Sequence, residues 1–140
     1  STADWDMVMT VNVRAPFILS REAIAPMRRA GGGVIINISS VVGVKAYVNQ
    51  GAYTASKHAL MGLSKVLAQE VQRDGIRVHT ICPGGVDTEM ASQARPDLDR
   101  SILISPQAVA QSAMFLLALG GNAAVDDIHL RRATGEPSWY

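Results

Sequence analysis

Two short β-branched apolar runs, separated by a long helical segment, constrain the fold of this chain more than any other feature. The runs are VIINIS at 34–39 and IRVHTIC at 76–82, and a helical pattern covers 52–73 between them. Two parallel strands need a crossover of a dozen or more residues, which is usually a helix. The pattern therefore predicts two parallel strands, of which the first fits a strand buried on both faces.

The rest of the chain continues this alternation. A helix is expected over 2–29, bent or ended early by Pro16 and Pro26 and terminated by the glycines at 31–33. Ser105 and Pro106 open a helix that runs to Leu119. The remaining expectations are a loop over 41–50, a turn-rich and irregular stretch from 83 to 99, a helix stop at Gly120–Gly121 and a short strand over 126–131. This order indicates an α/β fold with a parallel sheet and right-handed crossovers.

Composition excludes several classes of function. The 140 residues suit one domain, and a net charge of +1 gives no electrostatic footprint for nucleic acid or for a membrane. No run of eighteen apolar residues is present, and residues 1–10, STADWDMVMT, do not have the pattern of a signal peptide. The single cysteine, Cys82, ends an apolar run, which predicts a buried thiol in a reducing, cytoplasmic compartment. His58, His79 and His129 show no metal-ligand spacing, so no metal site is expected.

Tyr53 and Lys57 are the strongest candidates for chemistry. Four residues apart on a helix, they share one face about one turn from each other. A phenol is a poor acid or base at neutral pH, but a neighbouring ammonium favours its phenolate form. The pair therefore predicts a general acid/base, and the hydroxyl of Ser40 is suited to holding a substrate oxygen beside it.

A bare Tyr-x-x-x-Lys is weak evidence, because such pairs occur by chance in many helices. The placement of the other residues strengthens it. Ser40 follows the first predicted strand and Pro83-Gly84 ends the second, so both lie at the carboxyl edge of the sheet, where open α/β folds bind ligands. Thr88 follows a few residues later. The sequence thus predicts one crevice that receives residues from both strand ends.

These residues resemble the motifs of the short-chain dehydrogenase/reductase family in order and spacing. The resemblance rests on Asn12 in VNV, Ser40 in INISS, Tyr53 and Lys57 in YTASK, and the segment PGGVDT at 83–88. It extends from about Thr2 to Leu119. The family has a Rossmann fold, so the resemblance implies a partial Rossmann-like, doubly wound parallel sheet of about three strands with flanking helices.

The resemblance also implies a mechanism, the transfer of hydride between NAD or NADP and an alcohol or carbonyl substrate. Tyr53 is then the general acid/base, and Lys57 binds the nicotinamide ribose and favours the Tyr53 phenolate. Ser40 binds the substrate oxygen, and Asn12 anchors a water relay from Lys57 towards solvent. The residues implied to line the nicotinamide are Pro83, Gly84, Val86 and Thr88.

The family's glycine-rich turn and its NAD- or NADP-selecting residue are not found in residues 1–140. The glycines at 31–33 follow a helix and precede a strand, which is the reverse of a dinucleotide fingerprint. Residues 1–140 are therefore expected to be the carboxyl-terminal part of a single Rossmann-type dehydrogenase domain. Two alternatives keep the same residues, a non-catalytic binding or assembly module and one chain of a split enzyme.

The expected partners are a small-molecule substrate and further copies of this chain. In the family, the helices equivalent to 2–29 and 52–73 pair across a two-fold axis, which implies a homodimer or homotetramer. Trp139 and Tyr140 fit either a mobile tail or a subunit contact.

Overall fold

The computed structural model describes residues 1–94, 96–120 and 123–135, and it contains a three-strand parallel sheet. The strands are β1 (Gly33–Ile38), β2 (Ile76–Pro83) and β3 (Asp127–Leu130), in the order β1-β2-β3. Every pairing is parallel, with Ile38 opposite Ile81 and Pro83 opposite Leu130. The carboxyl ends of the strands therefore meet at one edge, as the sequence predicted.

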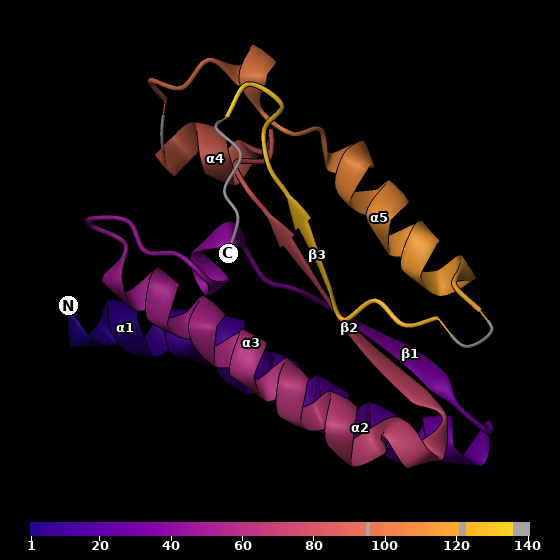
Figure 1. The fold of residues 1–140 in the computed structure, drawn as a ribbon. Coiled ribbons are helices and arrows are strands. Elements are labelled where there is room, and N and C mark those ends of the chain that lie inside the picture. The colour runs from indigo at the N-terminus through magenta and orange to yellow at the C-terminus, as the bar shows by residue number, and fades with distance from the viewer. Residues whose placement is uncertain (95, 121–122, 136–140) are drawn as a thin grey trace.

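Helices cover both faces of the sheet (Figure 1). On one face lie α1 (Thr2–Met9), α2 (Ala15–Arg29) and α3 (Gly51–Val71), and on the other lies α5 (Pro106–Ala118). The alternation of side chains along β2 explains this arrangement. Ile76 and Val78 pack on α3, whereas Arg77 between them donates a hydrogen bond to the carbonyl of Leu119, at the end of α5. The expected doubly wound α/β architecture is confirmed.

The core between β1, β2 and α3 consists of aliphatic side chains. Its buried members are Ile35, Leu67, Val71, Ile76 and Val78, with Ile24, Met27 and Ala68 packed against them. Burying branched aliphatic side chains of this size contributes about 1.5–3 kcal/mol each. This cluster fixes α3 along the sheet, and so fixes the height of each α3 residue relative to the strand ends.

The first helical segment contains a π-helical turn that the sequence did not predict. The expected helix over 2–29 is divided into α1, a π-turn at Thr10–Arg14 and α2. Within the turn, the Ala15 N–H bonds to the carbonyl of Thr10, five residues back. Pro16 explains the change, because it has no N–H to give to the carbonyl of Asn12 four residues earlier. Pro26 lies inside α2 without ending it.

Two further expectations were wrong. The irregular stretch from 83 to 99 contains a short helix, α4 (Glu89–Ala94), because the Thr88 hydroxyl accepts a hydrogen bond from the Ala91 N–H at its start. β1 is not buried on both faces, since Ile38 is 46% exposed. The reason is that Ile35 and Asn37 point to the face covered by α3, whereas Ile38 points to the opposite face, where α5 packs mainly on β2.

The remaining segments follow the prediction closely. α3 ends at Val71, where a 3₁₀ turn at Gln72–Asp74 leads into Gly75. The Ser105 hydroxyl caps α5 by accepting from the Ala108 N–H. No helix in the described ranges is long and apolar enough to cross a membrane. Gly121 of the predicted helix stop, Trp139 and Tyr140 lie outside the described residues.

Candidate active site

The ends of β1 and β2 bring Ser40 beside Pro83. The Ser39 N–H donates to the Ile81 carbonyl at 2.8 Å, which continues the strand pairing past the end of β1. Ser40 then turns away and caps a 3₁₀ turn at Val41–Gly43 by accepting from the Val42 N–H at 3.3 Å. Its hydroxyl lies 3.4 Å from the Pro83 carbonyl, which is long for a hydrogen bond between oxygens. That hydroxyl is held loosely, so a substrate oxygen would compete for it readily.

Lys57 and Tyr53 lie together on α3, at the end of β1. The Lys57 Nζ is 5.7 Å from the centre of the Tyr53 ring and donates to the Ile38 carbonyl at 3.0 Å. The Lys57 side chain is buried, and this burial lowers the pKa of its ammonium below 10.5, a shift that the nearby Cys82 opposes. An ammonium has three donors, and the carbonyl takes one of them. The others are suited to neutral oxygens such as hydroxyls.

Asn12 reaches the same turn of α3 from the π-turn. Its Nδ2 donates to the Ser56 hydroxyl at 3.1 Å, and Ser56 donates to the Tyr53 carbonyl at 2.7 Å. Sequence reasoning missed Ser56. The available signal was its position inside YTASK, three residues after Tyr53, where a serine hydroxyl reaches back to a helix carbonyl.

The four predicted catalytic residues are therefore linked unequally. Asn12 is joined to Tyr53 through Ser56, and Lys57 lies over the Tyr53 ring. Ser40 is joined to the end of β2 rather than to α3. Among the described residues, the Tyr53 hydroxyl makes no hydrogen bond, with Ser40 or with any other group.

The loop after β2 forms one wall beside these residues. Pro83 is buried, and the Gly84 N–H donates to the Leu130 carbonyl at 2.7 Å, so the loop follows β3. A Cβ at Gly84 would lie 3.3 Å from that carbonyl, tighter than a side chain normally sits. Val86 pairs with Ile104 in an isolated parallel bridge, which fixes both ends of the segment from Thr88 to Leu103.

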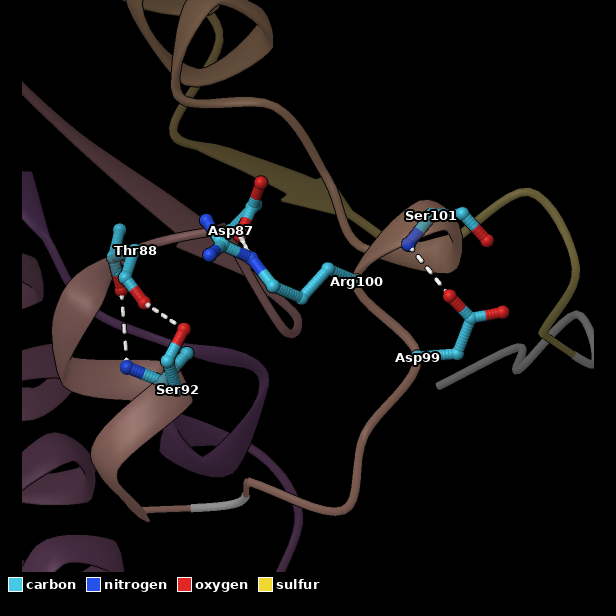
Figure 2. A network of polar contacts seen from close by, with 7 residues as sticks. Asp87, Thr88, Ser92, Asp99, Arg100 and Ser101 are labelled. Atoms are coloured by element: carbon cyan, nitrogen blue, oxygen red, sulfur yellow. Dashed lines mark hydrogen bonds and ion pairs between the residues drawn. The ribbon is translucent and has the colours of Figure 1, made fainter.

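An ion pair closes this segment, here called the lid (residues 87–104). Figure 2 shows the Arg100 guanidinium directed at Asp87, with the Arg100 Nε 2.6 Å from the carboxylate. Thr88 accepts through its carbonyl from the backbone N–H and the hydroxyl of Ser92, at 3.1 and 3.2 Å. The Asp99 carboxylate caps the next turn by accepting from the Ser101 N–H at 2.9 Å. The lid is thus built from polar contacts.

Cys82 is a buried thiol. Cys82 is fully buried against Met61, and burial raises the pKa of its thiol to about 11, so it is not a thiolate at neutral pH. This agrees with the expected buried thiol. No cluster of three metal-ligating side chains occurs in the described part of the chain.

The residues at the strand ends fit the nicotinamide end of a dinucleotide. A buried ammonium that makes no ion pair among the described residues suits ribose hydroxyls. A Cβ at Gly85 would meet Leu103 at 3.1 Å. Glycine at 84 and 85 is therefore required by close packing of the loop against Leu130 and Leu103.

Comparison with known proteins identifies the family. The family model described as short chain dehydrogenase matches residues 1–99. A D-beta-hydroxybutyrate dehydrogenase from Rhizobium meliloti is 41% identical over 110 residues, which are 79% of this chain and 43% of that protein. The chain thus spans less than half of that relative's length.

Solved structures of related proteins have the same fold. A β-ketoacyl-[ACP] reductase from Bacteroides thetaiotaomicron superposes with a TM-score of 0.79 at 30% identity, over 94% of this chain and 55% of that one. A protein from Beutenbergia cavernae, described provisionally as an NAD(P)-dependent gluconate 5-dehydrogenase, was solved with bound NADP at low occupancy. It superposes with a TM-score of 0.80 at 30% identity, over 92% and 56% of the two chains. The chain belongs to the short-chain dehydrogenase family.

Proposed function

We propose that this chain is the catalytic, carboxyl-terminal part of an NAD(P)-dependent oxidoreductase that acts on an alcohol or carbonyl substrate. The observation that carries the proposal is the Lys57 ammonium, buried at the end of β1 and 5.7 Å from the centre of the Tyr53 ring. A buried cation costs stability unless it is paired, and Lys57 has no carboxylate partner in the described ranges. Such a cost is typical of functional sites.

The proposed roles follow from the groups that each residue offers. The Tyr53 hydroxyl, free of other hydrogen bonds among the described residues, gives a proton to the substrate oxygen during reduction and takes it back during oxidation. The Lys57 ammonium favours the phenolate that this exchange leaves. Ser40 releases its weak contact with Pro83 and donates to the same substrate oxygen.

A nicotinamide cofactor, when bound, supplies or accepts the hydride. Lys57 would hold its ribose hydroxyls with the two donors that the Ile38 carbonyl leaves. Pro83, Gly84, Val86 and Thr88 would line its ring and exclude water from one side. The residues that choose between NAD and NADP are not among those at this end of the site, so both cofactors remain in the proposal.

Two observations support the assignment to part of a longer domain. The chain covers 43% of its Rhizobium relative and 55% of the Bacteroides reductase. Within the described residues β1 is an edge strand paired only with β2, so its other backbone edge is a template for pairing with a further strand. That strand would come from the same polypeptide, or from a second chain if the enzyme is split.

We also propose a partner for the face formed by α1, the π-turn, α2 and α3, which is a second copy of this chain. A groove of about 470 Å³ lies along α1, the π-turn, α2 and α3, away from Ser40 and Pro83. It is lined by Asp6, Met9, Thr10, Val13, Arg14, Phe17 and Leu63. Phe17 is 46% exposed and Val66 on α3 is 55% exposed, so the face suits an isologous helix–helix interface.

The substitution Tyr53→Phe in the full-length protein tests the function. It deletes one hydroxyl that makes no hydrogen bond within the described residues, so folding should be unchanged. Turnover of any accepted alcohol or carbonyl should fall by about 100-fold or more, as expected for a lost general acid/base. Tyr47→Phe is the matched control, because Tyr47 is an exposed tyrosine in the loop before α3. Normal turnover by the Tyr53→Phe protein would refute the acid/base role.

A further inference from the structure

A buried hydroxyl connects Asn12 to the backbone of Tyr53. The Asn12 Nδ2 donates to the Ser56 Oγ at 3.1 Å, and the Ser56 Oγ donates to the Tyr53 carbonyl at 2.7 Å. The side chain of Ser56 is fully buried, so water does not compete for either bond. A hydroxyl has a single donor hydrogen, and here it is directed at the Tyr53 carbonyl. Ser56 is therefore the acceptor for Asn12, which requires the NH₂ edge of the amide to face it.

The backbone around Asn12 needs such a restraint. Asn12 lies within the π-turn, where the Ala15 N–H bonds five residues back to Thr10. The carbonyl of Asn12 loses its ordinary helical donor four residues later, because that residue is Pro16. A helix segment with this altered bonding is not fixed by its own backbone in the way a regular turn is. Its contact with α3 sets where the Asn12 amide and carbonyl point.

We propose that Ser56 is a positioning residue, which holds the Asn12 amide in one orientation against the turn of α3 that carries Tyr53 and Lys57. It touches neither the substrate nor the cofactor and acts through Asn12. The inference rests on the proposed function, because the oriented Asn12 matters to turnover only if Tyr53 and Lys57 carry the reaction. The hydrogen-bonded link itself is independent of that function.

The same helix contains a matched control. The Asn37 Nδ2 donates to the Ser64 hydroxyl at 2.9 Å, and Ser64 donates to the Leu60 carbonyl at 2.8 Å. Ser64 is 3% exposed, so the two serines have nearly the same burial. Each serine hydroxyl accepts from an asparagine amide and donates to a carbonyl of α3. Ser64 lies eight residues further along α3 and links it to β1 instead of to the π-turn. Ser56→Ala and Ser64→Ala should therefore cost similar stability, and differ in what they do to turnover.

The kinetic test uses both variants in the full-length protein. Ser56→Ala should lower kcat by about tenfold to 100-fold, as a displaced group near the reacting atoms does, and change KM for the carbonyl substrate far less. Ser64→Ala should leave kcat within about twofold of the unsubstituted protein, because a core change remote from the site acts on stability. Ser56→Ala added to Asn12→Ala should have almost no further effect, since the two residues act as one unit. Equal kcat losses for the two serine variants, or independent effects of Ser56 and Asn12, would overturn the proposal.

A spectroscopic readout separates this inference from the proposed function. The side-chain NH₂ protons of Asn12, followed by ¹⁵N NMR in the full-length protein without substrate, should exchange slowly with water. Ser56→Ala should raise that exchange about tenfold or more, and Ser64→Ala should leave it unchanged. If Tyr53→Phe retained turnover, the proposed acid/base function would be refuted. The exchange rate of the Asn12 amide would still decide whether Ser56 holds Asn12. Unchanged exchange in Ser56→Ala would refute the link.

Discussion

The Lys57 ammonium lies 5.7 Å from the centre of the Tyr53 ring while donating a 3.0 Å hydrogen bond to the backbone at the end of β1. The same lysine is tied to the sheet and to the helix face that carries the phenol. Its burial lowers the pKa of the ammonium, which means that folding around the charged form is opposed. The lysine therefore destabilises the fold, and it sits where the proposed reaction needs a cation.

Replacing Lys57 by Met should stabilise the protein and abolish its activity. The variant keeps a long unbranched side chain and removes a buried charge, at the loss of one hydrogen bond to the Ile38 carbonyl. We expect the free energy of unfolding at pH 7, without cofactor, to rise by about 1 kcal/mol. Urea denaturation measures the change. Lys65→Met, an exposed lysine on the same helix, should change stability by less than about 0.5 kcal/mol.

The same comparison has a defined dependence on pH. Above the lowered pKa of Lys57 the folded protein has lost the proton, whereas the unfolded chain keeps it until about its ordinary value of 10.5. Lys57 therefore makes the unsubstituted protein more stable as pH rises through that window, and the advantage of Lys57→Met should shrink. Cys82, with its pKa raised to about 11, destabilises the fold as pH rises above 9.0. Cys82 is present in both proteins, so its effect largely cancels in the difference. A constant difference from about pH 7 to pH 10.5 would contradict the burial argument.

The Asp87–Arg100 pair should control the mobility of the lid. Arg100→Ala removes the 2.6 Å contact between Asp87, the first residue of the lid, and the 3₁₀ turn at Arg100–Ile102. The Val86–Ile104 bridge remains. We expect faster hydrogen exchange at backbone amides within 88–103 and no change in β2. Added salt should speed exchange of the unsubstituted lid in the same direction, because the pair is solvent-exposed. Arg21→Ala, which breaks an exposed pair with Glu22 on α2, is the control and should leave the lid unaffected. Identical lid exchange in both variants would exclude this role for the pair.

Periodicity and turn chemistry were sufficient to predict most of the fold. The run VIINIS became β1 and IRVHTIC became β2, because β-branched apolar residues between turn signals have few other stable conformations. The exposed edge of β1 was not readable in the same way. Whether a strand is central or at the edge of a sheet depends on which other strands are present. A β-branched apolar run is compatible with either position, so the sequence of the run does not distinguish them.

The candidate site was predictable to the extent that it depends on strand ends and one helix face. Ser40 and Pro83 meet because parallel strands end at one edge, and Lys57 reaches Tyr53 because they are one turn apart. The bond from Ser56 to the Tyr53 carbonyl is local and had a signal in YTASK, but the link from Ser56 to Asn12 was not predictable, since Asn12 is 44 residues away and is presented by a π-turn. Side-chain spacing does not separate a π-turn from an α-turn. The catalytic roles of these residues stay predictions.

Substituting Phe17 by Glu should convert a dimer into monomers. Phe17 lines the groove on α1, α2 and α3, and a charge there would be buried unpaired in an isologous interface. The variant helix itself should remain stable, because the introduced carboxylate would face Arg21 one turn later, where the guanidinium now lies 5.7 Å from the Phe17 ring. Sedimentation of the full-length protein should show dimerisation weakened by about 30-fold or more. Leu117→Glu is the control, because Leu117 is a half-exposed apolar residue on α5, on the opposite side of the sheet from Phe17. Dissociation by Leu117→Glu with none by Phe17→Glu would move the interface to the opposite side of the sheet.

The 140-residue chain by itself should not bind a dinucleotide tightly. In Rossmann folds the pyrophosphate is held at a helix N-terminus that follows a strand and a glycine-rich turn. Here the glycines at 31–33 come after α2 and before β1, and Gly31 and Gly32 adopt positive φ to end a helix. Lys57 and the 83–88 loop would therefore contact one end of the cofactor without its phosphates. We expect NADH or NADPH fluorescence to show no saturable binding to the isolated chain at low micromolar concentration, and clear saturation with the full-length protein. Tight binding by the isolated chain, with turnover of a carbonyl substrate, would refute the assignment to part of a larger domain and establish a minimal enzyme.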